Sequence, residues 1–300
     1  MHSHMPPPDL TRPRTAAARV VHALLVFLSA VNAWGQTAPS AATQSCGFAV
    51  IEYFSQGQGE PVILLPGSGL GVAYLEPLAE ALARGGYRSL RINPRGAGHS
   101  SGSLDVDYHD RAADVACVID ALRLGPVHLV GHAFGNRIAR TLAADRADLV
   151  RSITLLAAGG KVPSAPQVGP ALTKIYAPLP ETELIEAVSV SGLAGSSSNA
   201  AKVWKQLAPS LFPDSRPRGA APRLEEWWAP AGRAKFLVVQ GLNDLIAPPE
   251  NGRSLKQELG DRVTLVEFPG VGHMVSLEEP EKTANAILSF LQTTARAAAR

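Results

Sequence analysis

The feature of this chain that most constrains its fold is a regular alternation of two hydrophobic periods. Short apolar runs rich in β-branched residues predict strands at 48–54, 61–65, 88–92, 126–130, 152–156, 235–240 and 263–268. Stretches with an apolar residue every three to four positions predict helices between most of these strands. Strands that alternate with helices form a mostly parallel sheet covered by helices on both faces. The sequence therefore predicts an α/β fold.

A segment rich in Gly, Pro and Ser interrupts this alternation between residues 159 and 231. It contains only short helical patterns, so we interpret it as an insertion that caps the sheet. Trp204, Trp227 and Trp228 lie in this cap and would either line an apolar pocket or pack the cap against the sheet. The predicted organisation is a core at 47–158 and 232–293, a cap at 159–231, a linker at 36–46 and a tail at 294–300.

The N-terminal segment has the order of a secretory signal peptide. Three arginines precede an apolar run at 20–31, and the small residues Ala33 and Gly35 follow it. A membrane-spanning helix needs roughly 20 apolar residues. This run has 12, which favours a cleaved signal over the alternative, an uncleaved anchor. We therefore expect residues 1–35 to be removed and the protein to be secreted or periplasmic, with no stable membrane anchor.

The charge balance narrows the class of partner. The chain has 28 basic and 26 acidic residues, and removal of residues 1–35 leaves 25 of each. Binding to nucleic acid needs a basic excess that neutralises phosphates, so we expect no nucleic-acid partner. Apolar residues make up 46% of the chain and charged residues 18%, which is typical of a protein with a substantial buried core. A small-molecule substrate or ligand is the partner that remains.

The cysteines and histidines predict no metal and no cofactor. Two cysteines are too few for a disulfide framework or a multi-cysteine zinc site. Cys46 and Cys117 would either form one disulfide in an oxidising compartment or stay free, with Cys117 packed as a small hydrophobe on a helix face. No pair of histidines has metal-ligand spacing with a carboxylate, and we interpret His99 and His132 as loop or packing residues.

Four motifs follow predicted strands, in a fixed order along the chain. They are Leu64-Leu65-Pro66-Gly67-Ser68-Gly69, Arg95-Gly96-Ala97-Gly98-His99-Ser100, Gly131-His132-Ala133-Phe134-Gly135, and the pair Asp244 and His273. Together they resemble the α/β-hydrolase family over roughly residues 47–293. The resemblance implies a mostly parallel central sheet flanked by helices, with a helical cap insertion.

The same resemblance assigns roles to three positions and raises a difficulty at one of them. Asp244 and His273 match the acid and the base of the family's catalytic triad. The family's elbow is Gly-x-nucleophile-x-Gly, and here Ala133 occupies the nucleophile position between two retained glycines. A methyl group cannot attack a carbonyl, so the sequence excludes an acyl-enzyme formed at Ala133.

Backbone groups complete the implied site. By resemblance, the N–H groups of Ser68 and Phe134 form an oxyanion hole that binds a carbonyl oxygen or a developing negative charge. The helix that begins at Phe134 would add the positive end of its dipole, which favours a carboxylate or an enolate there.

Three interpretations follow from this set of residues. In the first, the protein is an enzyme that acts on a small ester- or lactone-type carbonyl compound, with His273, oriented by Asp244, as general base and no acyl-enzyme. In the second, it is a catalytically silent homologue that binds a small apolar ligand. In the third, it is a serine esterase whose nucleophile has been substituted by Ala133.

Overall fold

The computed structural model describes residue 1 and residues 39–230 and 232–298, with side chains up to residue 294. The predicted signal peptide at 1–35 therefore lies, apart from Met1, outside the described residues. Among the residues described, no helix is both long enough and apolar enough to cross a membrane.

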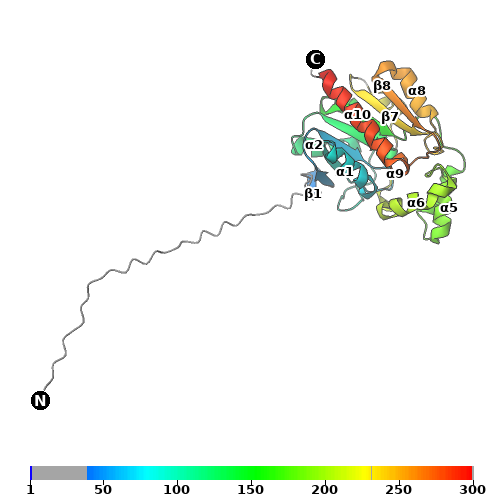
Figure 1. The fold of residues 1–300 in the computed structure, drawn as a ribbon, viewed down its shortest axis with the longest axis horizontal. Coiled ribbons are helices and arrows are strands. Elements are labelled where there is room, and N and C mark those ends of the chain that lie inside the picture. The colour runs from blue at the N-terminus through cyan, green and yellow to red at the C-terminus, as the bar shows by residue number, and fades with distance from the viewer. Residues whose placement is uncertain (2–38, 231, 299–300) are drawn as a thin grey trace.

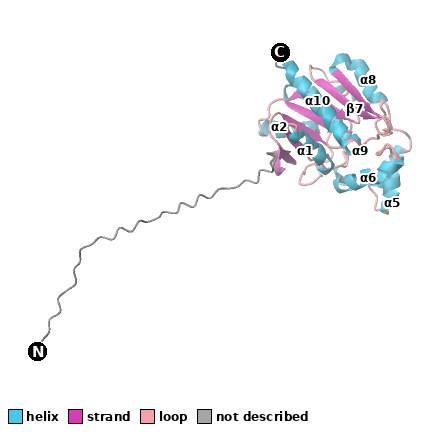
Figure 2. Ribbon diagram, in the orientation of Figure 1, coloured by secondary structure: helices cyan, strands magenta, loops and turns pink. Residues whose placement is uncertain are grey.

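An eight-stranded sheet of order β1-β2-β4-β3-β5-β6-β7-β8 forms the centre of the molecule (Figure 2). Its strands are β1 (Ser40–Cys46), β2 (Ala49–Gln56), β3 (Pro61–Leu65), β4 (Arg88–Ile92), β5 (Val127–His132), β6 (Val150–Leu156), β7 (Lys235–Gly241) and β8 (Val263–Phe268). The pairs β1–β2 and β2–β4 are antiparallel, and every other neighbouring pair is parallel. The predicted α/β fold with a mostly parallel sheet is confirmed.

Helices cover both faces of this sheet. The helices of the core are α1 (Glu76–Arg84), α2 (Tyr108–Ala121), α3 (Phe134–Asp145), α8 (Glu250–Leu259), α9 (Val275–Glu278) and α10 (Pro280–Ala298). Helices α1 and α10 pack on one face with Val62 and Leu64, whereas α2, α3 and α8 pack on the other with Ile63 and Leu65. Figure 1 shows α10, in red, lying across the sheet. Because β3 is buried on both faces, its sequence is continuously apolar.

Residues 159–230 contain short helices, most of which lie together at one end of the sheet (Figure 1). These are α4 (Val168–Ile175), α5 (Glu181–Val190), α6 (Ser197–Leu207) and α7 (Leu224–Trp227). Short 3₁₀ turns occur at Ala73–Leu75, Ala147–Leu149, Ala208–Ser210, Pro213–Ser215 and Gly260–Arg262.

The tryptophans of the predicted cap serve packing. Trp204 is buried among the apolar residues of α5 and α6. Trp227 and Trp228 are buried against α3, where the guanidinium of Arg140 lies 4.6 Å and 5.0 Å from their ring centres. None of the three lines the main cavity of the described structure, so of the two alternatives the packing role holds. The end of the predicted cap, from α7 onward, thus packs with the core rather than with the other cap helices.

Two expected boundaries are wrong. Residues 40–46 were expected in a linker but form β1, an edge strand paired with β2 from Ser40 opposite Ser55 to Cys46 opposite Ala49. Most of β1 is exposed, so no apolar period marks it, and backbone hydrogen bonds to β2 hold it in place. The expected tail at 294–300 was also wrong, because α10 continues to Ala298.

A disulfide between Cys46 and Cys117 joins β1 to α2 across 71 residues of sequence. The two cysteines therefore form a disulfide and are not free, which decides between the two alternatives stated above.

Candidate active site

A sharp turn connects β5 to α3 at Ala133. The residue has φ 50° and ψ −107°, a conformation that is costly for any residue with a side chain. Its N–H donates to the carbonyl of Leu156 at 3.0 Å, and its carbonyl accepts the N–H of Asn136 at 3.2 Å. These bonds anchor the turn to β6 on one side and to the first turn of α3 on the other.

The two glycines of the elbow are required by close backbone contacts. A Cβ on Gly131 would lie 2.5 Å from the backbone of Asn136, and a Cβ on Gly135 would overlap the carbonyl oxygen of Leu65. No side chain fits at either position, because the facing atoms belong to backbone that cannot move aside. The structure thus keeps the full geometry of an elbow around a residue that has only a methyl group.

Asp244 and His273 lie in the loops after β7 and β8 and are in contact. Nδ1 of His273 is 2.9 Å from Oδ2 of Asp244, so the predicted pair is present. The other carboxylate oxygen accepts the N–H groups of Ile246 at 2.9 Å and Ala247 at 2.8 Å. Both side chains are buried. With Nδ1–H donated to the carboxylate, Nε2 of His273 is the nitrogen left to accept a proton.

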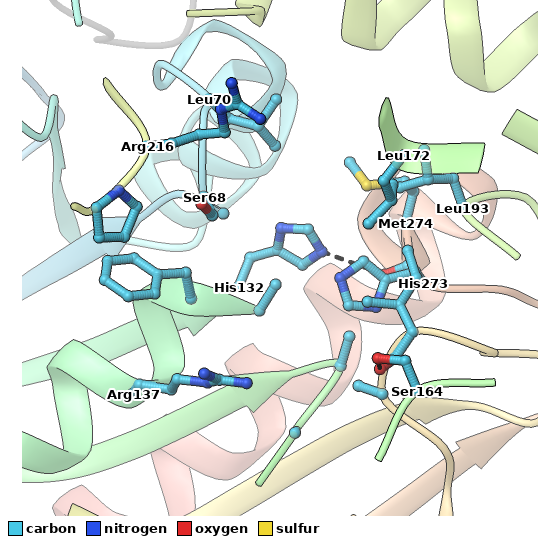
Figure 3. Close-up of a pocket in the computed structure, with 18 of the residues that line it drawn as sticks. Ser68, Leu70, His132, Arg137, Ser164, Leu172, Leu193, Arg216, His273 and Met274 are labelled. Atoms are coloured by element: carbon cyan, nitrogen blue, oxygen red, sulfur yellow. Dashed lines mark hydrogen bonds between the residues drawn. The ribbon is translucent and has the colours of Figure 1, made fainter. Parts of the chain in front are cut away.

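A chain of hydrogen bonds links the segment after β3, the end of β5 and the loop after β8. The N–H of Gly67 donates to Oη of Tyr74 at 3.0 Å, and that hydroxyl lies 2.8 Å from Nδ1 of His132. Nε2 of His132 lies 3.2 Å from the carbonyl oxygen of His273 (Figure 3). Because a carbonyl only accepts, His132 must donate from Nε2 and accept the Tyr74 proton at Nδ1.

The charge state of this chain follows from its burial. Burial, together with the neighbouring His273, lowers the pKa of His132 to about 3, and burial also raises the pKa of Tyr74. Both groups are therefore neutral near pH 7, as the hydrogen-bond assignment requires. The sequence identifies His132 only as a loop or packing residue and gives no role to Tyr74. No local sequence signal could have paired them.

The two expected oxyanion donors lie in the loop after β3 and at the start of α3. Within the described part of the chain, neither the N–H of Ser68 nor that of Phe134 has a hydrogen-bond acceptor. The carbonyl of Ser68 accepts the hydroxyl of Tyr176 at 2.9 Å, so a cap residue holds this loop.

Ser68, Ala133, Phe134 and His273 all line one cavity of about 520 Å³ between the sheet and the cap. Asp244 lies behind His273, outside the lining residues. Figure 3 shows His273 on one wall of the cavity, with Ser68 and Arg137 on the opposite side of the view. A crevice at the carboxyl ends of parallel strands is the usual ligand site of such sheets. In the described residues, no group of three or more His, Cys, Asp or Glu side chains is placed to hold a metal ion.

This arrangement has the chemical parts of a site for carbonyl compounds. An imidazole oriented by a carboxylate can take up and return a proton. Two backbone N–H groups that face one cavity can hold a carbonyl oxygen.

Comparison with known proteins agrees with this geometry. Residues 60–191 match the model of the alpha/beta hydrolase fold family, and residues 213–299 match that of the TAP-like proteins. RutD of Variovorax paradoxus, named as a carbamate hydrolase, is 31% identical over 252 residues, which cover 80% of this chain and 94% of RutD. The (E)-2-((N-methylformamido)methylene)succinate hydrolase of Acinetobacter baylyi is 26% identical over 254 residues, which cover 81% of this chain and 94% of that enzyme.

Among solved structures, BpoC of Mycobacterium tuberculosis H37Rv, named as a non-heme bromoperoxidase, superposes with a TM-score of 0.68 at 25% identity. The superposition covers 81% of this chain and 96% of BpoC. Matches that extend over most of both chains, together with the site geometry, show that this protein belongs to the α/β-hydrolase fold family.

Proposed function

We propose that this protein hydrolyses a small carbonyl compound of the ester or lactone type, with His273 as general base and without a serine acyl-enzyme. The observation that carries the proposal is the 2.9 Å contact between Nδ1 of His273 and Asp244, at a cavity that also holds two N–H groups with no acceptor among the described residues. The names of two relatives, a carbamate hydrolase and a succinate-derivative hydrolase, support a carbonyl substrate.

The reaction balances with water as the only co-reactant. Nε2 of His273 accepts a proton from a water molecule as that water attacks the carbonyl carbon. The carbonyl oxygen becomes negatively charged and accepts the N–H groups of Ser68 and Phe134. Collapse of this intermediate expels the alcohol oxygen, which takes the proton from His273 and leaves a carboxylic acid.

The missing nucleophile limits the rate to be expected. Serine hydrolases that lose their nucleophile retain roughly 10³–10⁴-fold acceleration over water, from binding and the oxyanion hole. General base catalysis adds about 10²–10⁴-fold where the base is well placed. Activated substrates such as aryl esters and strained lactones are therefore the compounds on which turnover should be measurable.

The test compares three variants on 4-nitrophenyl esters and lactones. His273→Ala should lower kcat/KM by about 10²-fold or more, since the base is lost, and Asp244→Asn should lower it through the wrong tautomer of His273. His99→Ala is the matched control, because that histidine is exposed, binds Glu52 and does not line the cavity. Unchanged activity of His273→Ala would refute the proposal.

A second candidate is a catalytically silent homologue that binds a small ligand. The methyl group of Ala133 favours it, because the residue that forms the covalent bond in this family is absent. Absence of turnover on the whole substrate panel, combined with a ligand-dependent rise in melting temperature, would establish this candidate instead.

We also propose that the protein is exported, on the strength of the predicted signal peptide at 1–35. A disulfide between Cys46 and Cys117 suits an oxidising compartment. Mass spectrometry of the protein from fractionated cells should find a mature N-terminus near Gln36 outside the cytoplasm. A full-length chain in the cytoplasmic fraction would contradict export.

A further inference from the structure

The charges that line the cavity all have one sign. Its lining includes two arginines, Arg137 and Arg216, and among the described residues no aspartate or glutamate. Arginines elsewhere commonly have carboxylate partners, as in the bidentate pair of Arg95 with Asp114 at 2.7 Å and 2.8 Å. The described residues place no carboxylate within ion-pair distance of either cavity arginine. Both guanidinium groups at the cavity thus lack a carboxylate partner among the described residues, and each favours a negatively charged ligand.

Arg137 is held in place by neutral groups. It lies on α3, one helical turn after Ala133, and is half-buried. Its Nη1 donates to Oη of Tyr108 at 3.0 Å, and its guanidinium lies 5.4 Å from the ring centre of Trp227. A guanidinium has five N–H donors, so this arrangement fixes the group and leaves most of its donors for a ligand.

Arg216 reaches the cavity from the cap. Its Nε donates to the carbonyl of Pro213 at 2.9 Å, and its guanidinium lies 4.9 Å from the ring centre of Tyr176. The hydroxyl of that tyrosine binds the carbonyl of Ser68, so Arg216 is tied to the loop of the oxyanion hole. In Figure 3, Arg216 lies at the upper left of the view and Arg137 at the lower left, with Ser68 between them, and His273 lies on the right.

We infer that the ligand of this cavity carries a carboxylate in addition to its reacting carbonyl group, that Arg137 binds that carboxylate, and that Arg216 adds positive charge to the cavity. A planar guanidinium binds a carboxylate through two parallel N–H···O bonds, which gives both affinity and orientation. The carboxylate would thus be held away from His273, with the carbonyl group of the same molecule between Arg137 and the base. The inference rests on the proposed function only for the identity of the reacting carbonyl.

Binding of monomethyl glutarate and dimethyl glutarate, measured by calorimetry, tests this inference. The two compounds have nearly the same size and differ by one negative charge. The monoanion should bind at least tenfold more tightly at low salt, and added salt should reduce the difference. Arg137→Met should abolish the preference, and Arg137→Lys should retain part of it because the charge remains. Arg216 is exposed, so Arg216→Met should weaken the preference without disturbing the core.

Arg151→Met is the matched control, because Arg151 is paired with Glu60 at 2.7 Å and does not line the cavity. This variant should keep the full preference for the monoanion. Equal binding of the two esters by the wild type, or an undiminished preference in folded Arg137→Met and Arg216→Met, would overturn the inference.

Kinetics on the 4-nitrophenyl monoester of glutaric acid and on its methyl ester separates this inference from the proposed function. Turnover that depends on His273 but is indifferent to charge would leave the hydrolase proposal standing and remove the carboxylate subsite. A binding preference for the anion that depends on the arginines, without turnover, would leave the carboxylate subsite standing and remove the hydrolase proposal.

Discussion

Ala133→Ser is the substitution that tests the elbow most directly. The backbone at Ala133 already has φ 50°, the flanking glycines admit the turn, and the neighbouring cavity of about 520 Å³ has room for one added oxygen. The His273–Asp244 pair that would activate a hydroxyl is in contact at 2.9 Å. If Ala133 occupies the family's nucleophile position, as the resemblance implies, a hydroxyl added there would complete a triad.

The size of the effect follows from known losses of a nucleophile. Removal of the serine from a serine hydrolase lowers kcat by about 10⁶-fold, which corresponds to roughly 8 kcal/mol of transition-state stabilisation. A misplacement of about 1 Å costs about 10²-fold. Ala133→Ser should thus raise the hydrolysis of 4-nitrophenyl acetate by about 10⁴–10⁶-fold over the wild type.

The assay is stopped-flow kinetics combined with intact-mass spectrometry. The variant should show a burst of 4-nitrophenol and an acetylated species, whereas the wild type should show neither. The same substitution combined with His273→Ala is the control and should lose both signals. A folded Ala133→Ser protein with no gain in rate and no acylation would refute the conclusion that Ala133 and His273 face a common reaction point.

Three further predictions concern stability, each measured by urea unfolding. His132 has a pKa of about 3 when folded against an ordinary 6.5, so the unfolded chain binds the extra proton between these values. Stability should fall by up to about 1.4 kcal/mol per pH unit as pH drops from 6.5 toward 3, and His132→Gln should have a shallower slope; equal slopes would contradict this. Replacement of Cys46 and Cys117 by alanine removes a crosslink across 71 residues and should cost about 2–4 kcal/mol, whereas no change would show that the bond constrains nothing. Gly135→Ala should cost about 3 kcal/mol or more because its Cβ overlaps backbone, while Gly169→Ala on α4, with open space around it, should be neutral or stabilising. Equal costs would contradict that account.

The sequence predicted most of the sheet, with the clearest signal where strands are buried on both faces, as β3 and β4 are. The runs at 61–65, 88–92 and 263–268 coincide with β3, β4 and β8. Asp244 and His273 could be placed together because both follow parallel strands, whose carboxyl ends meet at one edge of the sheet. Local patterns and topology were enough for this part of the site.

Features that depend on partners distant in sequence were not predictable. Strand β1 has no large apolar residue and is held in place by its pairing with β2.

The hydrogen-bond chain and the arginines of the site were not predictable for the same reason, because they join residues that are distant in sequence. The chain from Tyr74 through His132 to His273 joins residues that lie 58 and 141 positions apart. Arg137 and Arg216, 79 positions apart, line the same cavity only because the cap folds over the sheet. A sequence pattern records the period of a helix or a strand, but not which of its polar side chains will face a common cavity.

The strained turn at Ala133 retains a purpose without a nucleophile. A backbone at φ 50° costs about 1–3 kcal/mol for alanine, and such strain persists where surrounding contacts impose it. Here the turn starts α3 at the cavity, which leaves the N–H of Phe134 and the positive end of the helix dipole beside Ser68. Both favour negative charge, as do Arg137 and Arg216. In the proposed function the elbow therefore serves as an anion-binding element, since the donors proposed to hold an oxyanion and the arginine proposed to hold a carboxylate line one cavity.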